Sequence, residues 1–280
     1  QGTVSGGTGR PGLAADITNR VPSKEAKDRG HELKYLCAVF YSASGAGKTT
    51  LSGTLAEIAR KPLHLCVDRS AADSLSVVPG ERTIKYLENP IDEIEALYPK
   101  LRAAGDNLPG GCVWDSITQM VAKDLDSLKL SKKYKNPLQA YGEILERYRR
   151  QITLYCSLPW HMLFLALAEV YNDPLKPAPE GVRIGPGPSE YQPPQLIRPD
   201  IDGATKRRVG SYVNVMGYMY KTPKGGDATE YWVTFQHAVA ETKFCGAPRR
   251  TTKISDPSIK KILEAVGWLD NGPKETPKEA

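Results

Sequence analysis

Hydrophobic positions in the first part of the chain alternate between short apolar runs and helical spacing. Residues 33–41 form an apolar run of strand character, and residues 62–67 form another. Between them Leu51 and Leu55 repeat at a helical interval, which predicts a helix over residues 48–60. The pattern therefore predicts a strand, a loop, a helix and a second strand, which is the opening of a βαβ unit.

The same alternation continues through the middle of the chain. Residues 110–116 (GGCVWDS) are a short apolar run ending near an acid, and a helical pattern starts at Ile117. Residues 137–156 have the spacing of another helix, and residues 161–167 form a fully apolar strand. Strands separated by helices predict an α/β fold, in which helices cover both faces of a mostly parallel central sheet.

The pattern changes in the last third of the chain. Residues 172–198 are rich in proline and glycine, which predicts a long loop without regular structure. Residues 211–220 and 230–238 are joined by TPKGGDA and predict a C-terminal antiparallel hairpin, and residues 258–266 predict a closing amphipathic helix.

Composition suggests one domain with loosely held ends. Residues 1–30 are rich in Gly, Ser, Lys and Asp with little apolar periodicity, so we expect a flexible tail there. We expect one domain over residues 31–270 and a short tail over 271–280. The length of 280 residues would also allow two small domains.

Composition and charge narrow the functional classes. The chain is 40% hydrophobic and 25% charged, as in soluble globular proteins. We expect a cytoplasmic protein with no membrane partner, because no apolar run approaches the roughly 18 to 20 residues of a membrane span and the first residues lack a secretory signal. The net charge of +6 permits a polyanionic partner without demonstrating one. None of the five cysteines has metal-ligand spacing.

The strongest chemical signal is the stretch SASGAGKT at residues 42–49. It matches the phosphate-binding pattern G-x-x-x-x-G-K-[ST] except that Ser42 replaces the first glycine. The predicted strand before it and helix after it are the context this motif needs, and Gly45 and Gly47 allow the loop amides to wrap an anion. The predicted nucleotide-binding residues are Ser44, Gly45, Ala46, Gly47, Lys48, Thr49 and Thr50.

The motif also assigns roles to individual side chains. Lys48 would reach the β- and γ-phosphates, and the Thr49 hydroxyl would be a ligand of Mg²⁺. Such a metal needs an acid from the end of a neighbouring strand, and Asp115 is the best-placed acid. Ser42 is small, so we expect it to weaken the motif rather than abolish it. The alternative is a Ser/Gly loop that only starts a helix.

The order of these motifs resembles that of RecA-type ATPases, and more narrowly that of phage-encoded members associated with single-strand annealing and recombination. The resemblance covers about residues 33–268 and rests on YSASGAGKTT, CVDRS, VWDSIT, LPWHMLFLALAEV and TKFCGAPRR. It implies a RecA-like P-loop core that uses ATP and Mg²⁺. It also implies a homo-oligomer, a ring or a filament, with nucleotide between subunits, in the host bacterial cytoplasm if the protein is phage-encoded.

The resemblance implies catalytic roles for Lys48 and Asp115. The glutamate that activates water in RecA-like enzymes corresponds to Ser70 here, and serine is a poor base. Asp68 would be a substitute base, as would Asp73, or the protein turns ATP over slowly. Glu169 stands where a glutamine usually senses the γ-phosphate. It would orient the attacking water, or it is a solvated acid at a strand end.

The resemblance also implies contacts with DNA and with neighbouring subunits. In the family, the loop after the sensor contacts single-stranded DNA, and residues 171–210 correspond to it. Its basic residues are interleaved with Tyr191, which suits a surface that follows a backbone and stacks bases, although a solvated insertion is the alternative. The candidate DNA-binding residues are Lys176, Arg183, Arg198, Lys206, Arg207 and Arg208. The candidate trans-acting cations are Lys243, Arg249 and Arg250.

Together these features favour an ATP-binding RecA-like recombination protein. It would bind single-stranded DNA and promote annealing or strand pairing, with slow Mg²⁺-dependent ATP hydrolysis at subunit interfaces. A single-strand-binding protein is a further candidate partner. The alternatives are a non-catalytic ATP-binding scaffold of a phage DNA-processing assembly, and a small-molecule P-loop kinase that would need Arg183 and Arg198 in a lid.

Overall fold

Ten strands pair into one sheet in the described part of the chain. The structure is a computed structural model, and it describes residues 35–131, 136–172, 195–201, 211–225, 228–235, 240–244, 253–265 and 268–269.

The strands are β1 (Cys37–Ser42), β2 (Leu63–Cys66), β3 (Thr83–Tyr86), β4 (Gly111–Asp115), β5 (His161–Asn172), β6 (Gln195–Pro199), β7 (Val215–Pro223), β8 (Thr229–Thr234), β9 (Lys243–Phe244) and β10 (Lys253–Ser255). The helices are α1 (Lys48–Gly53), α2 (Ala71–Ser76), α3 (Pro90–Ala103), α4 (Ile117–Ser131), α5 (Pro137–Cys156) and α7 (Ile259–Ala265), with 3-10 turns η2 (Thr54–Glu57) and η3 (Gly105–Asn107). The tails predicted for residues 1–30 and 271–280 lie outside the described residues.

The strand order brings the ends of the central parallel strands to one edge of the sheet. The order is β10-β8-β7-β1-β5-β4-β2-β3, with β6 added to β5 and β9 added to β7. β5 lies between β1 and β4 and runs parallel to both, and its register pairs Ser42 with Leu167 and Asp115 with Leu165. The carboxyl ends of β1 and β4 therefore open on the same edge, which is where α/β sheets usually bind ligands.

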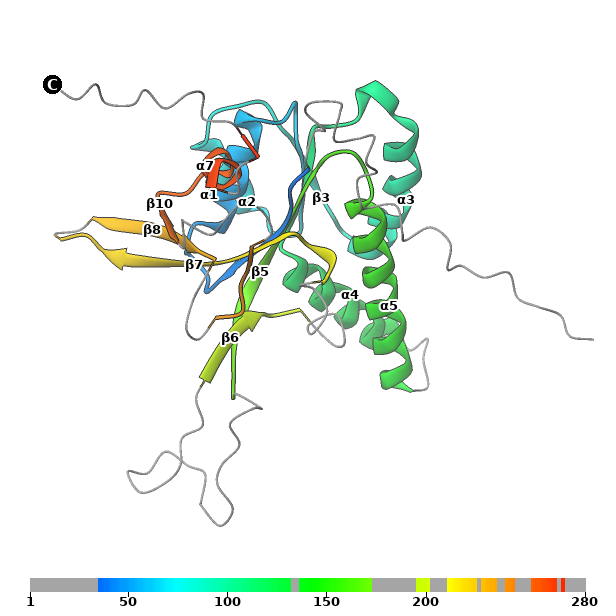
Figure 1. The fold of residues 1–280 in the computed structure, drawn as a ribbon. Coiled ribbons are helices and arrows are strands. Elements are labelled where there is room, and N and C mark those ends of the chain that lie inside the picture. Colours follow the sequence, from blue (N-terminus) through cyan, green and yellow to red (C-terminus); the bar gives the residue numbers. More distant parts are fainter. Residues whose placement is uncertain are drawn as a thin grey trace, which may run out of the picture. The chain divides into compact units, whose positions relative to one another are not determined.

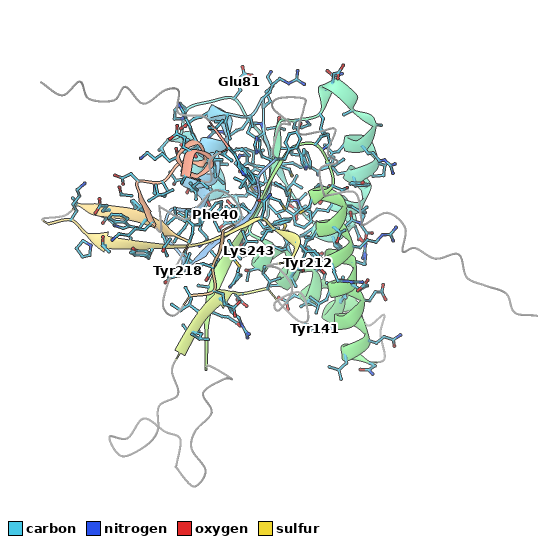
Figure 2. All side chains as sticks on the ribbon, in the orientation of Figure 1. Phe40, Glu81, Tyr141, Tyr212, Tyr218 and Lys243 are labelled. Carbon is cyan, nitrogen blue, oxygen red and sulfur yellow. The ribbon has the colours of Figure 1, made fainter. Side chains whose placement is uncertain are left out.

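Helices cover both faces of this sheet, as the sequence predicts. Figure 1 shows α3, α4 and α5 on one side and α1, α2 and α7 on the other. The alternation along β1 explains the two layers, because Cys37, Val39 and Tyr41 join the apolar cluster of α3 to α5. Ala38 and Phe40 join the cluster that includes residues of α1 and α7. Side chains fill the space between sheet and helices (Figure 2).

An aromatic cluster holds β4 in place. Trp114 is fully buried, and its ring makes edge contacts with Tyr148, Tyr155 and Phe164 at centroid distances of 6.4, 5.2 and 5.1 Å. Buried aromatic pairs of this geometry are each worth about 0.5–1.5 kcal/mol beyond the burial itself. Trp114 is thus a core residue, and its packing fixes the backbone that carries Asp115.

The predicted hairpin is confirmed, while the predicted helix over residues 48–60 is wrong in its length. β7 and β8 pair antiparallel. The α-helix after the loop ends at Gly53 and continues only as the turn η2. Thr54 explains the change, because its hydroxyl donates to the carbonyl oxygen of Leu51 at 2.7 Å and accepts from the amide of Ile259 at 2.8 Å. The start of α7 therefore docks where α1 ends.

The prediction that residues 172–198 hold no regular structure is also wrong in part. Residues 195–199 form β6, which pairs antiparallel with the extended end of β5. Pro199 is tolerated because it is the last residue of the strand. Between residues 68 and 110 the sequence analysis placed no element, and the structure has α2, β3 and α3 there. No helix in the described ranges is long and apolar enough to cross a membrane.

Candidate nucleotide site

The loop after β1 makes a tight turn that depends on two glycines. Gly45 has a φ of 74° and Gly47 a φ of 82°, both in the left-handed region that other residues rarely adopt. Gly47 is the residue before α1, and Ala46 between the two glycines is buried. The backbone of this turn therefore requires glycine at both positions 45 and 47, which explains the GxG spacing in the sequence.

Lys48 lies inside the loop rather than on its surface. Its side chain is buried, and its Nζ donates to the carbonyl oxygens of Ser42 and Ala43 at 3.2 and 3.0 Å. A third bond runs from Nζ to Oγ of Ser42 at 2.8 Å. An ammonium group has three N–H donors, and these three acceptors use all of them. A phosphate oxygen must therefore take over at least one of these bonds.

Ser42, the departure from the phosphate-loop pattern, has a specific place in this network. It is the last residue of β1 and has no exposed surface. Its hydroxyl donates to the carbonyl oxygen of Ala43 at 2.7 Å while accepting from Lys48. A glycine at this position would leave the lysine one acceptor fewer, so the serine holds Lys48 toward the base of the loop.

We expect Ser42→Gly to tighten binding of Mg²⁺·ATP by about ten-fold or more, because hydrogen bonds to charged groups contribute roughly 1.5–3 kcal/mol and the ligand would have one fewer to displace. Isothermal titration calorimetry measures the change. Ser42→Thr keeps the hydroxyl and is the matched control, which should bind as the wild type does. Unchanged or weaker binding by Ser42→Gly would show that the serine does not restrain Lys48.

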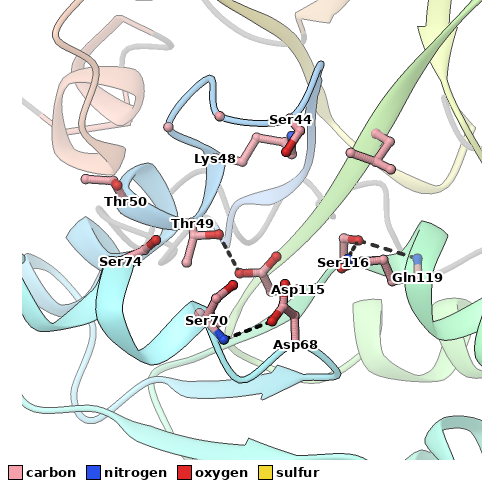
Figure 3. Close-up of a pocket in the computed structure, with 14 residues that line it drawn as sticks. Ser44, Lys48, Thr49, Thr50, Asp68, Ser70, Ser74, Asp115, Ser116 and Gln119 are labelled. Carbon is pink, nitrogen blue, oxygen red and sulfur yellow. Dashed lines mark hydrogen bonds between the residues drawn. The ribbon is translucent and has the colours of Figure 1, made fainter.

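Thr49 and Asp115 come together from two different elements. Thr49 lies in the first turn of α1 and Asp115 is the last residue of β4. The Thr49 hydroxyl donates to Oδ2 of Asp115 at 2.8 Å, as Figure 3 shows. A hydroxyl and a carboxylate held this close are oxygen ligands of the kind that Mg²⁺ uses beside nucleotide phosphates.

Burial shapes the charges of these groups. Burial raises the pKa of the Asp115 carboxyl above its ordinary value, while the bond from Thr49 and the charge of Lys48 lower it. Burial likewise lowers the pKa of the Lys48 amine, and Asp115 opposes that shift. The protein therefore only partly compensates the buried charges of Lys48 and Asp115. Such a pair favours the binding of further charged groups, such as an anion and a cation.

These residues line a cavity of about 290 Å³, which we call the loop cavity. Its lining residues are Ser44, Gly45, Gly47, Lys48, Thr49, Thr50, Asp68, Ser70, Ala71, Ser74, Asp115, Ser116, Gln119 and Leu167. The labelled side chains around it in Figure 3 are all polar or charged and come from α1, α2, β4, α4 and the loops that flank them. The cavity therefore fits an anionic group with a cation, because it combines a left-handed glycine turn, a buried amine and a hydroxyl–carboxylate pair.

Three polar residues of the loop cavity, Ser74, Ser116 and Gln119, were missed by the sequence analysis. Ser116 is buried, and its Oγ donates to Oε1 of Gln119 at 2.9 Å. Ser116 and Gln119 follow Asp115, where β4 passes into α4. For these two the available signal was the spacing: residues one and four positions after a strand-end acid return to the same face when a helix begins there.

The site lies at the edge where the central parallel strands end. The phosphate-type loop follows β1, Asp115 ends β4, and β5 lies between these strands with its neighbours parallel. The fold is a mixed α/β fold with a mostly parallel central sheet and a C-terminal antiparallel hairpin. Neither a protein-family model nor a curated protein matches the chain. A solved structure of a prototypical ATPase from the type III secretion system of pathogenic bacteria is similar, at 12% identity and a TM-score of 0.42. The similarity covers 66% of this chain and 51% of that ATPase, so the matched part is about half of its length.

Two acids predicted to act on the γ-phosphate lie in different places in this fold. Asp68 lines the loop cavity, and its Oδ1 accepts from the backbone amide of Ser70 at 2.8 Å. Glu169 is not among the lining residues. Its carboxylate pairs with Arg198, its register partner on β6. The same ion pair occupies Arg198, which the sequence analysis assigned to DNA.

Among the remaining residues predicted to contact DNA or a neighbouring subunit, the structure describes only Lys243. Lys243 lies on β9 and donates from Nζ to the carbonyl oxygen of Val213 at 2.7 Å, and Figure 2 marks its position beside the neighbouring Tyr212. Outside the described residues lie Lys176, Arg183, Tyr191, Lys206, Arg207, Arg208, Arg249 and Arg250. Their roles stay predictions from the sequence.

Proposed function

We propose that this protein binds ATP with Mg²⁺ in the loop cavity and hydrolyses it slowly. The observation that carries the proposal is the convergence of three groups on one cavity, namely the Lys48 amine, the Thr49 hydroxyl and the Asp115 carboxylate. Lys48 would exchange a loop acceptor for a phosphate oxygen. Thr49 and Asp115 would hold the cation, which would neutralise phosphate charge when bound.

Slow turnover follows from the residue that stands at the expected base position. Ser70 is exposed, lines the loop cavity and precedes α2. Its hydroxyl cannot accept a proton from water at neutral pH, so Asp68 is the remaining carboxylate that could do so from the same wall. Asp68 already accepts the Ser70 amide at 2.8 Å, which restrains its orientation.

We therefore expect Ser70→Glu to raise the rate of ATP hydrolysis by on the order of 100-fold, because a positioned general base typically contributes that much. Phosphate release under saturating ATP and Mg²⁺ measures the rate. Ser70→Gln is the matched control, since it has the same size without a base, and it should stay at the wild-type rate. ATP affinity should change little in either variant.

One observation favours a second candidate, a non-catalytic ATP-binding scaffold. Ser70 lacks a base, and the described part of the loop cavity offers only Asp68 besides the metal-side Asp115. If Ser70→Glu and Ser70→Gln hydrolyse ATP equally slowly while both bind it tightly, nucleotide acts as an assembly ligand rather than as a substrate. The position of the P-loop and of Asp115 would be the same for both functions.

The finer part of the proposal concerns assembly on DNA. We propose a homo-oligomer, a ring or a filament, that binds single-stranded DNA and promotes annealing or strand pairing. Basic residues interleaved with Tyr191 in residues 171–210 support DNA binding, and Lys243 with Arg249 and Arg250 support contacts to a neighbour's nucleotide. This support comes from the sequence pattern.

Two measurements test the DNA proposal. Single-stranded DNA should stimulate ATP hydrolysis, and its affinity should fall steeply with salt because phosphate contacts release counterions. Electron micrographs with a non-hydrolysable ATP analogue should show rings or filaments on the DNA. Isolated particles with salt-independent DNA binding would reject assembly on DNA while leaving ATP binding intact.

A further inference from the structure

The β7–β8 hairpin presents one of its faces to the phosphate-type loop. In its register Lys221 is paired with Tyr231, so both side chains point to the same face of the hairpin. Met219 is two residues from Lys221 and shares that face. The paired residues Tyr220 and Trp232 point to the opposite face.

Tyr231 lies directly against the loop. A Cβ atom added to Gly47 would be 3.2 Å from Cδ1 of the Tyr231 ring, so the ring occupies the space that a side chain at position 47 would need. The residue is nevertheless 37% exposed, and the backbone oxygen of Tyr231 accepts from the amide of Asp256 at 2.8 Å. A partly exposed tyrosine, anchored on a strand, therefore lies beside Gly47.

Lys221 brings a second group to the same loop. A Cβ atom added to Gly45 would be 3.9 Å from Nζ of Lys221. The side chain is exposed, and within the described ranges no hydrogen-bond or ion-pair partner is found for its amine. A cation next to a glycine turn that suits phosphate is therefore still able to donate all three of its N–H groups.

A second cavity lies between the hairpin and the loop. This hairpin cavity has a volume of about 480 Å³, and its lining includes Leu51, Met219, Tyr231 and Asp256. It shares Gly45, Gly47, Thr50 and Ser74 with the loop cavity. An aromatic and aliphatic lining with a small number of polar groups, here Thr50, Ser74 and Asp256, is typical of ligand sites, and the shared glycine turn joins it to a polar cavity suited to phosphates.

We propose that the hairpin completes the nucleotide site, with Tyr231 stacking on the nucleobase and Lys221 contacting the triphosphate from the side opposite Lys48. This inference rests on the proposed function, because it concerns the same bound nucleotide. It assigns the base to the hairpin cavity and the phosphates to the loop cavity. It also makes the face of one hairpin, rather than the loop alone, responsible for recognising a nucleotide as distinct from a free polyphosphate.

The test for Tyr231 compares two ligands by isothermal titration calorimetry, Mg²⁺·ATP and Mg²⁺·tripolyphosphate, which lacks a base. Tyr231→Ala should weaken ATP binding about ten-fold and leave tripolyphosphate binding unchanged, since base–aromatic stacking is worth roughly 1–3 kcal/mol. Tyr231→Phe keeps the ring and should bind ATP as the wild type does. Tyr220→Ala, on the opposite face of the same hairpin, is the control and should not alter ATP binding.

The test for Lys221 uses the same two ligands. Lys221→Gln should weaken both about equally, by roughly five- to ten-fold, because it removes a charge-assisted contact to phosphate. Lys224→Gln removes a nearby exposed lysine of the hairpin and should leave both affinities unchanged. Thermal unfolding of each variant shows whether the hairpin is still folded.

Three outcomes overturn the inference. Tyr231→Ala could bind ATP as tightly as Tyr220→Ala, it could lose ATP and tripolyphosphate equally, or Lys221→Gln could match Lys224→Gln. If Tyr231→Ala does not fold, two other measurements still test the inference. They are the ATP affinity of Tyr231→Phe and the ratio of ATP affinity to tripolyphosphate affinity in Lys221→Gln. Failure of the proposed function looks different, because then the wild type itself would bind neither ligand.

Discussion

Replacing Lys48 with alanine should lower the affinity for Mg²⁺·ATP by at least about 100-fold, the largest effect expected from a single side chain in this protein. Lys48 is buried at the base of the loop, and its three hydrogen bonds go to Ser42 and Ala43. Alanine supplies no cation, so a bound triphosphate would meet only amide and hydroxyl dipoles. Isothermal titration calorimetry with Mg²⁺·ATP measures the loss.

A surface lysine provides the comparison for Lys48. Lys61 forms an exposed ion pair with Glu81, and exposed pairs of this kind contribute about 1 kcal/mol or less to stability. Lys61→Ala should bind ATP normally. Circular dichroism on Lys48→Ala checks that the fold is retained. A folded Lys48→Ala protein with wild-type affinity would mean that the loop cavity is not a triphosphate site.

Replacing Asp115 with asparagine should remove the Mg²⁺ dependence of ATP binding. The wild type should bind ATP much more tightly with Mg²⁺ than with a chelator, and in Asp115→Asn the two affinities should approach each other. Asparagine can still accept the hydroxyl bond from Thr49, which is 2.8 Å long in the structure, so the geometry is kept while the metal-side charge is lost. Titrations with and without Mg²⁺ give the ratio.

The same variant should be more stable than the wild type when no ligand is present. Burial raises the folded-state pKa of Asp115 above its ordinary value of 3.8, so the folded chain binds this proton more tightly than the unfolded chain. Stability from this group is therefore present at low pH and falls as the pH rises through the folded pKa. Asparagine carries no titrating proton and so avoids this loss of stability. The thermal midpoint of Asp115→Asn should therefore exceed that of the wild type at neutral pH, and the difference between the two midpoints should shrink toward pH 3.8.

Asp124 is the matched control for a buried carboxylate away from the cavity. It accepts hydrogen bonds from the Tyr148 hydroxyl and from the amide of Ile91, and burial raises its pKa as well. Asp124→Asn should leave the Mg²⁺ dependence of ATP binding unchanged. If both aspartate variants retain that dependence, Asp115 is not the metal-side acid.

Most of the α/β architecture could be predicted from local patterns. The helix over residues 137–156 is confirmed at both ends, because Pro137 starts it and a long amphipathic repeat sustains it. The strand that carries Trp114 is confirmed as well. The prediction fails where a neighbour decides the outcome. β6 exists because the end of β5 that extends beyond β1 and β4 offers hydrogen bonds to residues 195–199, and the end of α1 at Gly53 reflects the bond between Thr54 and α7.

At the candidate site, the residues that lie within one turn of the chain could be predicted from local patterns alone. The positions of Gly45, Gly47, Lys48 and Thr49 follow from backbone geometry and from spacing along a few residues, and those constraints are local. Asp115 could be found because strand-end residues of parallel strands meet at one edge.

Which side chains meet across elements depends on how the strands and helices pack. It places Glu169 against Arg198, makes Ser42 an acceptor for Lys48, and sets Tyr231 and Lys221 over the two loop glycines. The physical reason is that strand pairing and helix packing bring together residues as many as 205 positions apart, and no periodicity along the chain records which partner a side chain will find.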